Sequence, residues 1–324
     1  MPAHRTLVAA GARPSTRRMV WVVAVLGACF VAIRAGLPYA PVLWFAALRA
    51  LVAGVVLVGV GLARRRRLPR GLAEWAVVAG LGAANATVGF ATMFLGVVHL
   101  STGIASVLAN SQPLLIVLPG WALYAERPTR STVMGLAVGF AGLVIVAIPG
   151  GGGSGAALSI GAAGAATVGT LIARQLGSLD DVVAGGWSFL LGGMVLAAWA
   201  GLDEGAPAIR WDLRFVAVLA FLGVLGTAAV YVAWFKEARR CPLHRLAAWT
   251  FAVPVFGLVL AALLEGERPS AWTAAGMTVV LGAMWLVLRG NRRPRVDAIR
   301  LSAAASSSDP GERPRPETRS SRDT

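Results

Sequence analysis

A row of hydrogen-bonding side chains lies within the apolar stretch 98–124. Thr102, Ser106 and Asn110 follow one another at intervals of four residues, which places them on one face of a helix. Gln112 comes two residues later, so the row ends in two amides. Amides and hydroxyls at the centre of an apolar segment need partners or water. They indicate either the wall of a solvated cavity or polar packing contacts between helices, worth about 0.6 kcal/mol each.

Two further polar side chains, Arg49 and Asn85, lie deep inside apolar stretches. Arg49 is about seven residues into the stretch 42–62, which corresponds to ~10 Å along a helix. An arginine at the centre of a membrane span costs roughly 2.5–3.5 kcal/mol on translocon scales. A water-filled cavity or a carboxylated substrate would reduce that cost. Arg49 and Asn85 are therefore candidate substrate-binding residues, with packing as the alternative for the amide.

Aromatic side chains supply a second candidate wall. Thr227, Tyr231 and Trp234 have the spacing i, i+4, i+7 within one apolar stretch, and Trp249 lies near the start of the next. Such a wall suits an amphipathic or partly aromatic solute, or a cation held over ring faces. Packing or an interface belt is the alternative role for these rings.

The apolar stretches lack the groups that an enzyme inside a membrane would need, namely a metal cluster, paired acids or an activated nucleophile. There is no HExxH motif, and Cys29 and Cys241 have no CxxC spacing. All 15 acidic residues lie in loops, tails or the ends of apolar stretches. We therefore predict no enzymatic activity, no metal, no cofactor and no buried carboxylate for proton relay.

The composition shows that membrane helices must position these side chains. Hydrophobic residues make up 57% of the 324 residues, against about 45–50% in soluble domains. A bilayer core needs ~20 apolar residues per helix, and ten stretches reach or nearly reach that length. The sequence predicts an all-α integral membrane protein with ten transmembrane helices between tails at 1–18 and 290–324. The ten stretches are 19–38, 42–62, 73–95, 98–124, 132–149, 156–176, 183–202, 214–236, 242–264 and 272–289.

The net charge of +15 indicates membrane topology rather than nucleic-acid binding. The arginines form short clusters between apolar stretches, and no basic surface domain is present in the sequence. With an inside amino terminus, the inner segments near the spans hold 20 Lys and Arg, and the outer loops hold 3. The positive-inside rule predicts that both termini are cytoplasmic.

The chain contains an internal repeat with an offset of 141 residues. The tripeptide Glu-Arg-Pro at 126–128 recurs at 267–269, and the same offset maps Pro113 onto Pro254. Each proline lies inside an apolar stretch and removes a backbone hydrogen bond, so both should kink their helices near the centre. The kinks are either gating hinges or packing features.

The offset divides the chain into two five-helix repeats, 19–149 and 156–289, joined by a glycine-rich connector at 150–155. Because each repeat has an odd number of spans, the second copy must enter the membrane from the opposite side. Inverted repeats are typical of secondary transporters, which expose a midplane site alternately to the two sides of the membrane.

The sequence resembles ten-span, two-repeat transporters of the drug/metabolite superfamily that carry EamA-type domains. The resemblance covers residues 19–289 and rests on "FVAIRAG", "PVLWFAALRALVAG", "YAERPT" after a proline-containing span, and "EGERPS" in the second copy. It implies a bacterial inner-membrane carrier of small organic solutes, commonly an exporter. It also implies that the first four helices of each repeat form a central cavity and that the fifth is peripheral.

A receptor or scaffold without transport activity is the alternative function. It is supported by the arginine-rich tails and by Gly135 and Gly139, whose spacing suits close packing within the chain or in a homodimer. We favour an alternating-access exporter of a metabolite, amino acid or drug-like compound. Its expected partners are that small molecule and the lipid bilayer, with a homodimer left open and no nucleic acid.

Overall fold

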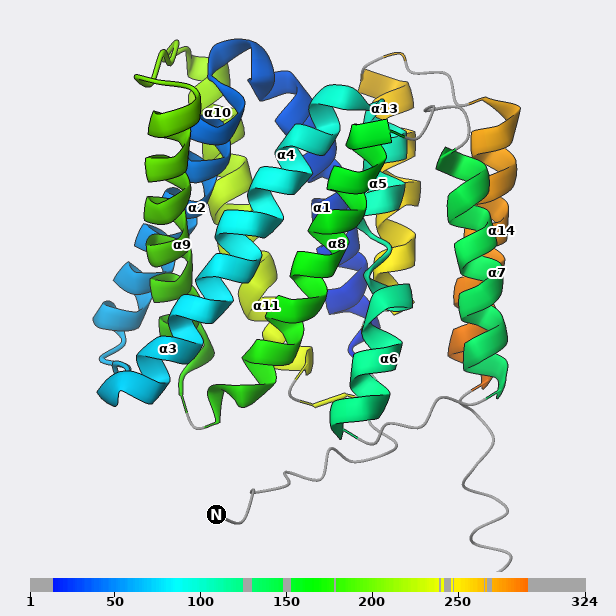
Figure 1. Cartoon of the computed structure of the whole chain (residues 1–324), viewed down its shortest axis with the longest axis horizontal. Helices are drawn as coiled ribbons and strands as arrows, with labels where there is room; N and C mark the ends of the chain where they lie inside the picture. Colours follow the sequence, from blue (N-terminus) through cyan, green and yellow to red (C-terminus); the bar gives the residue numbers. More distant parts are fainter. Residues whose placement is uncertain are drawn as a thin grey trace, which may run out of the picture.

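The fold is helical throughout the part of the chain that the structure describes (Figure 1). Both Glu-Arg-Pro tripeptides and most of the two predicted tails lie outside the described residues. The computed structural model describes residues 14–124, 130–147, 153–177, 179–238, 240–241, 246, 248–264, 266 and 270–290.

The first helix begins at Thr16, inside the predicted tail 1–18, so the first repeat starts earlier than predicted. Two arginines lie in its first turn. Arginine can place its charged end in water while its stem follows the helix. Ser101 accepts a hydrogen bond from the backbone N–H of Ile104 and so caps the fifth helix. The elements are α1 (Thr16–Gly36), η1 (Leu37–Tyr39), α2 (Val42–Ala63), α3 (Gly71–Gly82), the π-helical η2 (Ala83–Gly89), α4 (Phe90–His99), α5 (Thr102–Ala109), α6 (Gln112–Tyr124) and α7 (Arg130–Ala147).

The second repeat has the same order of elements. Its first helix begins at Gly153, inside the predicted connector, and the Asp180 and Asp212 side chains cap the N-termini of two later helices. The elements are α8 (Gly153–Ala173), η4 (Arg174–Leu176), α9 (Asp181–Asp203), α10 (Leu213–Ala220), the π-helical η5 (Phe221–Ala229), α11 (Val230–Ala238), η6 (Ala248–Ala252), α13 (Val253–Leu264) and α14 (Ala271–Gly290).

Six helical segments are long and apolar enough to cross a membrane, and three shorter apolar helices accompany them in the described residues. The fold is therefore that of an all-α integral membrane protein, as predicted. Each of the ten predicted stretches contains helical structure in its described residues, while the count of ten membrane crossings stays a prediction. The six segments are Thr16–Tyr39, Val42–Ala63, Gly71–His99, Gly153–Leu176, Asp181–Asp203 and Leu213–Ala238.

The two repeats run in opposite directions. In Figure 1 the chain rises from α3 to α4, whereas it descends through the equivalent pair from α10 to α11. The π-helical segments η2 and η5 occupy matching places in these pairs. The packing follows the same symmetry, because α2 packs on α9, α7 on α14, α1 on α13, and α8 on α5 and α6. This is the inverted arrangement that the odd number of helices per repeat predicts.

The stretch 98–124 is broken rather than kinked. Helix α5 ends at Ala109, Ser111 is not helical, and α6 starts at Gln112. Pro113 is the second residue of α6, where its missing N–H leaves no hydrogen bond unmade. Pro254 is likewise the second residue of α13, after the 3-10 segment η6. The predicted interruptions are present, but each proline begins a helix instead of bending one.

Helices α7 and α14 form a pair at the side of the bundle, at the right of Figure 1. Their backbones approach closely, since a Cβ added to Gly142 would lie 3.0 Å from the carbonyl oxygen of Gly276. The Ser131 hydroxyl also donates a hydrogen bond of 3.1 Å to the Leu286 carbonyl. The fifth helix of each repeat is thus peripheral, as the resemblance implied.

Candidate functional site

A cavity of about 210 Å³ lies between the two repeats. Its lining comes from α1, α2, η2, α4, the junction between α5 and α6, α8, α9, η5, α11 and η6. Both repeats therefore contribute to one site. Seven of the residues proposed from the sequence line it: Arg49, Asn85, Asn110, Gln112, Thr227, Tyr231 and Trp234.

The structure places Thr102, Ser106 and Trp249 outside this lining. Thr102 and Ser106 are fully buried on α5, which packs against α1, α8 and α13. A Cβ added to Gly257 of α13 would lie 2.8 Å from the Ser106 Oγ, so this face of α5 is a tight helix contact. Trp249 is half-buried against the core. Of the row Thr102, Ser106 and Asn110, only Asn110, the residue that follows α5, lines the cavity.

Arg49 is the central charged group of the site. Its side chain is 3% exposed, and its guanidinium carbon lies 4.5 Å from the centre of the Phe90 ring. Nε donates a hydrogen bond of 2.8 Å to the Thr227 hydroxyl, and Nη2 donates one of 3.2 Å to the Gly226 carbonyl. Among the described residues, Nη1 has no hydrogen-bond acceptor. Arg49 therefore joins the repeats and keeps one donor unused.

The acceptors for Arg49 come from the π-helical turn of η5. The Thr227 hydroxyl donates a hydrogen bond of 2.8 Å to the carbonyl of Leu222, five residues earlier. Gly226, the residue before it, offers its carbonyl to Arg49. Single π-helical turns within α-helices often occur at functional sites, because they change which groups face a neighbour. Here the wide turn presents a hydroxyl and a carbonyl toward α2.

The amide side of the cavity is partly occupied by contacts within the protein. Gln112 Nε2 donates to the carbonyl of Ala166, at 3.1 Å, and to Thr170 Oγ1, at 2.9 Å. Asn110 Nδ2 donates a hydrogen bond of 2.8 Å to the Ser106 carbonyl, which is one of the last carbonyls of α5. The two amides thus use their NH₂ groups in contacts that hold the broken helix in place.

Four phenylalanines of the lining were missed by the sequence analysis: Phe30, Phe90, Phe189 and Phe235. Phe189 stacks on Phe90 with ring centres 5.8 Å apart and meets Tyr231 edge-on at 5.2 Å. The repeat gave a signal for one of them, since the offset of 141 maps Phe90 onto Tyr231. Phe189 is one apolar residue among many in α9, and no pattern distinguishes it.

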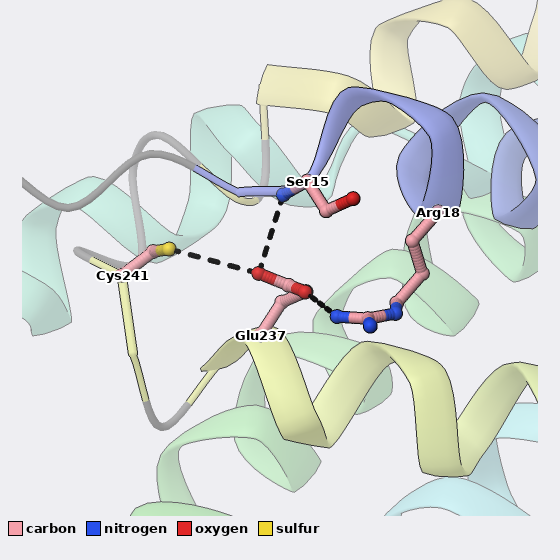
Figure 2. A network of polar contacts seen from close by, with 4 residues as sticks. All are labelled: Ser15, Arg18, Glu237 and Cys241. Atoms are coloured by element: carbon pink, nitrogen blue, oxygen red, sulfur yellow. Dashed lines mark hydrogen bonds and ion pairs between the residues drawn. The ribbon is translucent and has the colours of Figure 1, made fainter.

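A second polar cluster lies where α1 begins and α11 ends (Figure 2). The Glu237 carboxylate is only 3% exposed, forms an ion pair with Arg18, and accepts a hydrogen bond of 3.4 Å from the Ser15 backbone N–H. The Cys241 thiol lies 3.9 Å from the same carboxylate. Glu237 is thus a carboxylate at the end of a span, as predicted for the acidic residues, but it is buried, because segments distant in the sequence cover the end of this helix. The absence of a carboxylate proton relay stays a prediction.

The fold and the cavity together define a class of protein: a multi-pass membrane protein with two inverted helical repeats around a shared polar and aromatic pocket, as in secondary transporters. The chain belongs to the EamA-like transporter family, whose model matches residues 19–148 and 153–289. The two matches confirm the repeat predicted from the 141-residue offset.

Several known proteins are similar to this chain over most of its length. The uncharacterized transporter YvbV of Bacillus subtilis is 26% identical, and the match covers 90% of this chain and 98% of that protein. A probable amino-acid metabolite efflux pump of Salmonella typhimurium is 26% identical, over 84% and 93%. A probable terminal-alkyne amino-acid exporter of Streptantibioticus cattleyicolor is 28% identical, over 85% and 94%.

A solved crystal structure shares the fold. It superposes with a TM-score of 0.69 at 22% sequence identity, and the match covers 87% of this chain and all of that one. At this identity the likeness establishes the fold alone.

Proposed function

We propose that this transporter exports a small organic solute across a bacterial plasma membrane by alternating access between its repeats. The cavity carries the proposal, because one pocket is lined by Arg49 from the first repeat and Thr227 from the second. Inverted repeats around a shared site are the arrangement on which alternating access depends. The outward direction is supported by the names of two relatives, an efflux pump and an exporter.

The size of the cavity favours a small metabolite over a large drug-like compound. Its 210 Å³ is below the ~300–1,000 Å³ of typical small-molecule pockets. A solute about as large as an amino acid fits that space without a change in the walls. Both relatives with printed solutes also refer to amino acids.

Contacts between the repeats at the end of the bundle where α1 begins support a gating movement. The ion pair of Arg18 with Glu237 joins α1 to α11, and that of Arg66 with Asp180 joins the end of α2 to the start of α9. A solute that entered from this end would require α1 and α11 to separate. Pro113 and Pro254, at the starts of α6 and α13, are the proposed flexing points.

Blocking the cavity tests the proposal. Ala166 lines the cavity from α8, whereas Val168 on the same helix is 49% exposed. Compounds that stabilise the purified protein, from a screen of amino acids, purine metabolites and cationic dyes, are loaded into proteoliposomes. We expect Ala166→Phe to abolish their release and Val168→Phe to leave it unchanged. If every stabilising compound leaves the proteoliposomes no faster than it leaves protein-free vesicles, a receptor or scaffold would be favoured instead.

The positive-inside count supports cytoplasmic placement of both termini. Fusions of green fluorescent protein and alkaline phosphatase to the C-terminus test it. The first should fluoresce and the second should be inactive, and the reverse result would place the C-terminus outside and contradict the proposed topology.

A further inference from the structure

We infer that the transported solute carries a carboxylate, which binds Nη1 of Arg49. This inference rests on the proposed transport function and adds the chemical class of the substrate. It starts from two observations: Arg49 lines the cavity, and the Nη1 donor of its buried guanidinium has no hydrogen-bond partner among the described residues. A buried charged donor without a partner is unfavourable, so a ligand that supplies an acceptor gains the full value of the contact.

The charges around the cavity favour an anion. None of the described residues that line it is acidic, so Arg49 has no counter-ion there. Its hydrogen-bond partners are the Thr227 hydroxyl, the Gly226 carbonyl and, at 3.9 Å, the Cys29 Sγ, and none of them is a carboxylate. The other charged side chain that is buried among the described residues is Glu237, and Arg18 neutralises it at the end of the bundle. The counter-ion for Arg49 must therefore arrive with the ligand.

The break between α5 and α6 adds to the same preference. Helix α6 starts at Gln112, which lines the cavity, so the positive end of its dipole lies at the site. The opposing negative end, that of α5, is partly satisfied by the Asn110 amide. Half-helix N-termini at membrane depth bind anionic groups of substrates in other transporters with inverted repeats.

The remaining walls indicate what the carboxylate is attached to. Phe189, Tyr231 and Trp234 line the cavity, together with aliphatic groups from α1 and α8. The apolar or aromatic part of the solute would pack against these side chains, while its carboxylate would bind the planar guanidinium. A phosphate ester fits less well, because a dianion would face a single arginine among neutral and apolar groups.

Matched carboxylates and amides test the inference on the full-length protein in detergent. Propionate, isovalerate and 3-phenylpropionate are titrated beside propionamide, isovaleramide and 3-phenylpropanamide, and the thermal melting of the protein is followed. We expect at least one carboxylate to bind about ten- to hundredfold more tightly than its amide, which keeps the shape and loses the charge. Equal binding by amides, or no melting shift with any carboxylate, overturns the inference. A shift with sodium chloride or sodium phosphate alone, equal to that with the carboxylates, also overturns it.

Variants locate the binding group. Arg49→Gln should remove the preference for the carboxylate, and Arg49→Lys should keep part of it because the charge remains. Arg34→Gln is the control, since Arg34 is half-buried on α1 and donates to the Val97 and Leu100 carbonyls outside the cavity lining. Full preference in Arg49→Gln would overturn the inference. If Arg49→Gln does not fold, the comparison of acids with amides on the unmodified protein still decides.

The two proposals can fail separately. If neutral or cationic compounds leave proteoliposomes and carboxylates do not bind, transport stands and the carboxylate assignment is wrong. If no compound from the screen leaves the vesicles, the transport proposal fails first.

Discussion

Two charged side chains of the described residues, Arg49 and Glu237, are buried to the same extent, yet their surroundings differ. Each is 3% exposed. Glu237 has an ion pair with Arg18 and a backbone N–H donor. Arg49 has neutral acceptors, an aromatic face and one nitrogen without an acceptor among the described residues. A buried charge that the protein satisfies holds elements together, whereas the one left incompletely satisfied beside the cavity is the group that we propose for ligand binding.

The largest effect is expected when Glu237 loses its cation. Arg18→Met leaves a carboxylate buried beneath α1, so the free energy of unfolding should fall by on the order of 2–3 kcal/mol. Denaturant titration in detergent micelles measures it. Arg17→Met is the control, because Arg17 is exposed in the same helical turn. A similar loss in both variants would show that the ion pair contributes nothing specific.

The double variant Arg18→Met, Glu237→Leu sharpens this result. Removal of both charges replaces the pair with apolar side chains, so most of the lost stability should return. A double variant that is less stable than Arg18→Met would mean that Glu237 has a further essential partner.

A smaller loss is expected when Arg49 loses the acceptor for Nε. Thr227→Val should lower the free energy of unfolding by about 1.5 kcal/mol, the usual range for a hydrogen bond to a charged group. Thr167→Val is the matched control, since that buried hydroxyl bonds only a carbonyl of its own helix in the described contacts. Equal losses would contradict a special role for the Arg49 contact.

The aromatic contact of Arg49 should contribute less again. A double-mutant cycle of Phe90→Leu with Arg49→Met should give a coupling energy of about 1 kcal/mol, because a cation lies over the ring. The thermal melting of the four proteins, converted to free energies, measures the coupling. A coupling near zero would mean that Phe90 only fills space.

The smallest change is expected at the thiol beside Glu237. Cys241→Ser keeps the size of the side chain and a donor near the carboxylate, so stability should change by less than about 0.5 kcal/mol. The measurement is the same denaturant titration. A loss comparable to that of Arg18→Met would show that the thiol contributes as much as the arginine to holding Glu237.

The helices and their duplication could be predicted because both depend on local composition. Apolar stretches long enough to cross a bilayer mark the helices, and the shared offset of Pro113 and Pro254 marks the repeats. Arg49 could be proposed for the site because a charge at membrane depth is costly unless it has partners, water or a ligand. These arguments require no knowledge of which helices are neighbours.

The features that were missed depend on packing between distant segments. Spacing puts Thr102 and Ser106 on one face of a helix, but it does not say that α1 and α13 cover that face. Glu237 is at the end of its helix, and its burial comes from Arg18 and the start of α1, 219 residues away. Phe189 has no pattern that separates it from other apolar residues of α9.

The wide turns in η2 and η5 make the register of two long helices depend on one residue each. An α-helix turns by about 100° per residue, so deletion of a single residue that restores regular α-helix would rotate everything beyond it by that angle. In η5, such a deletion before Gly226 would swing its carbonyl and the Thr227 hydroxyl away from α2. Length in these two segments is therefore under tighter constraint than the identity of most of their side chains.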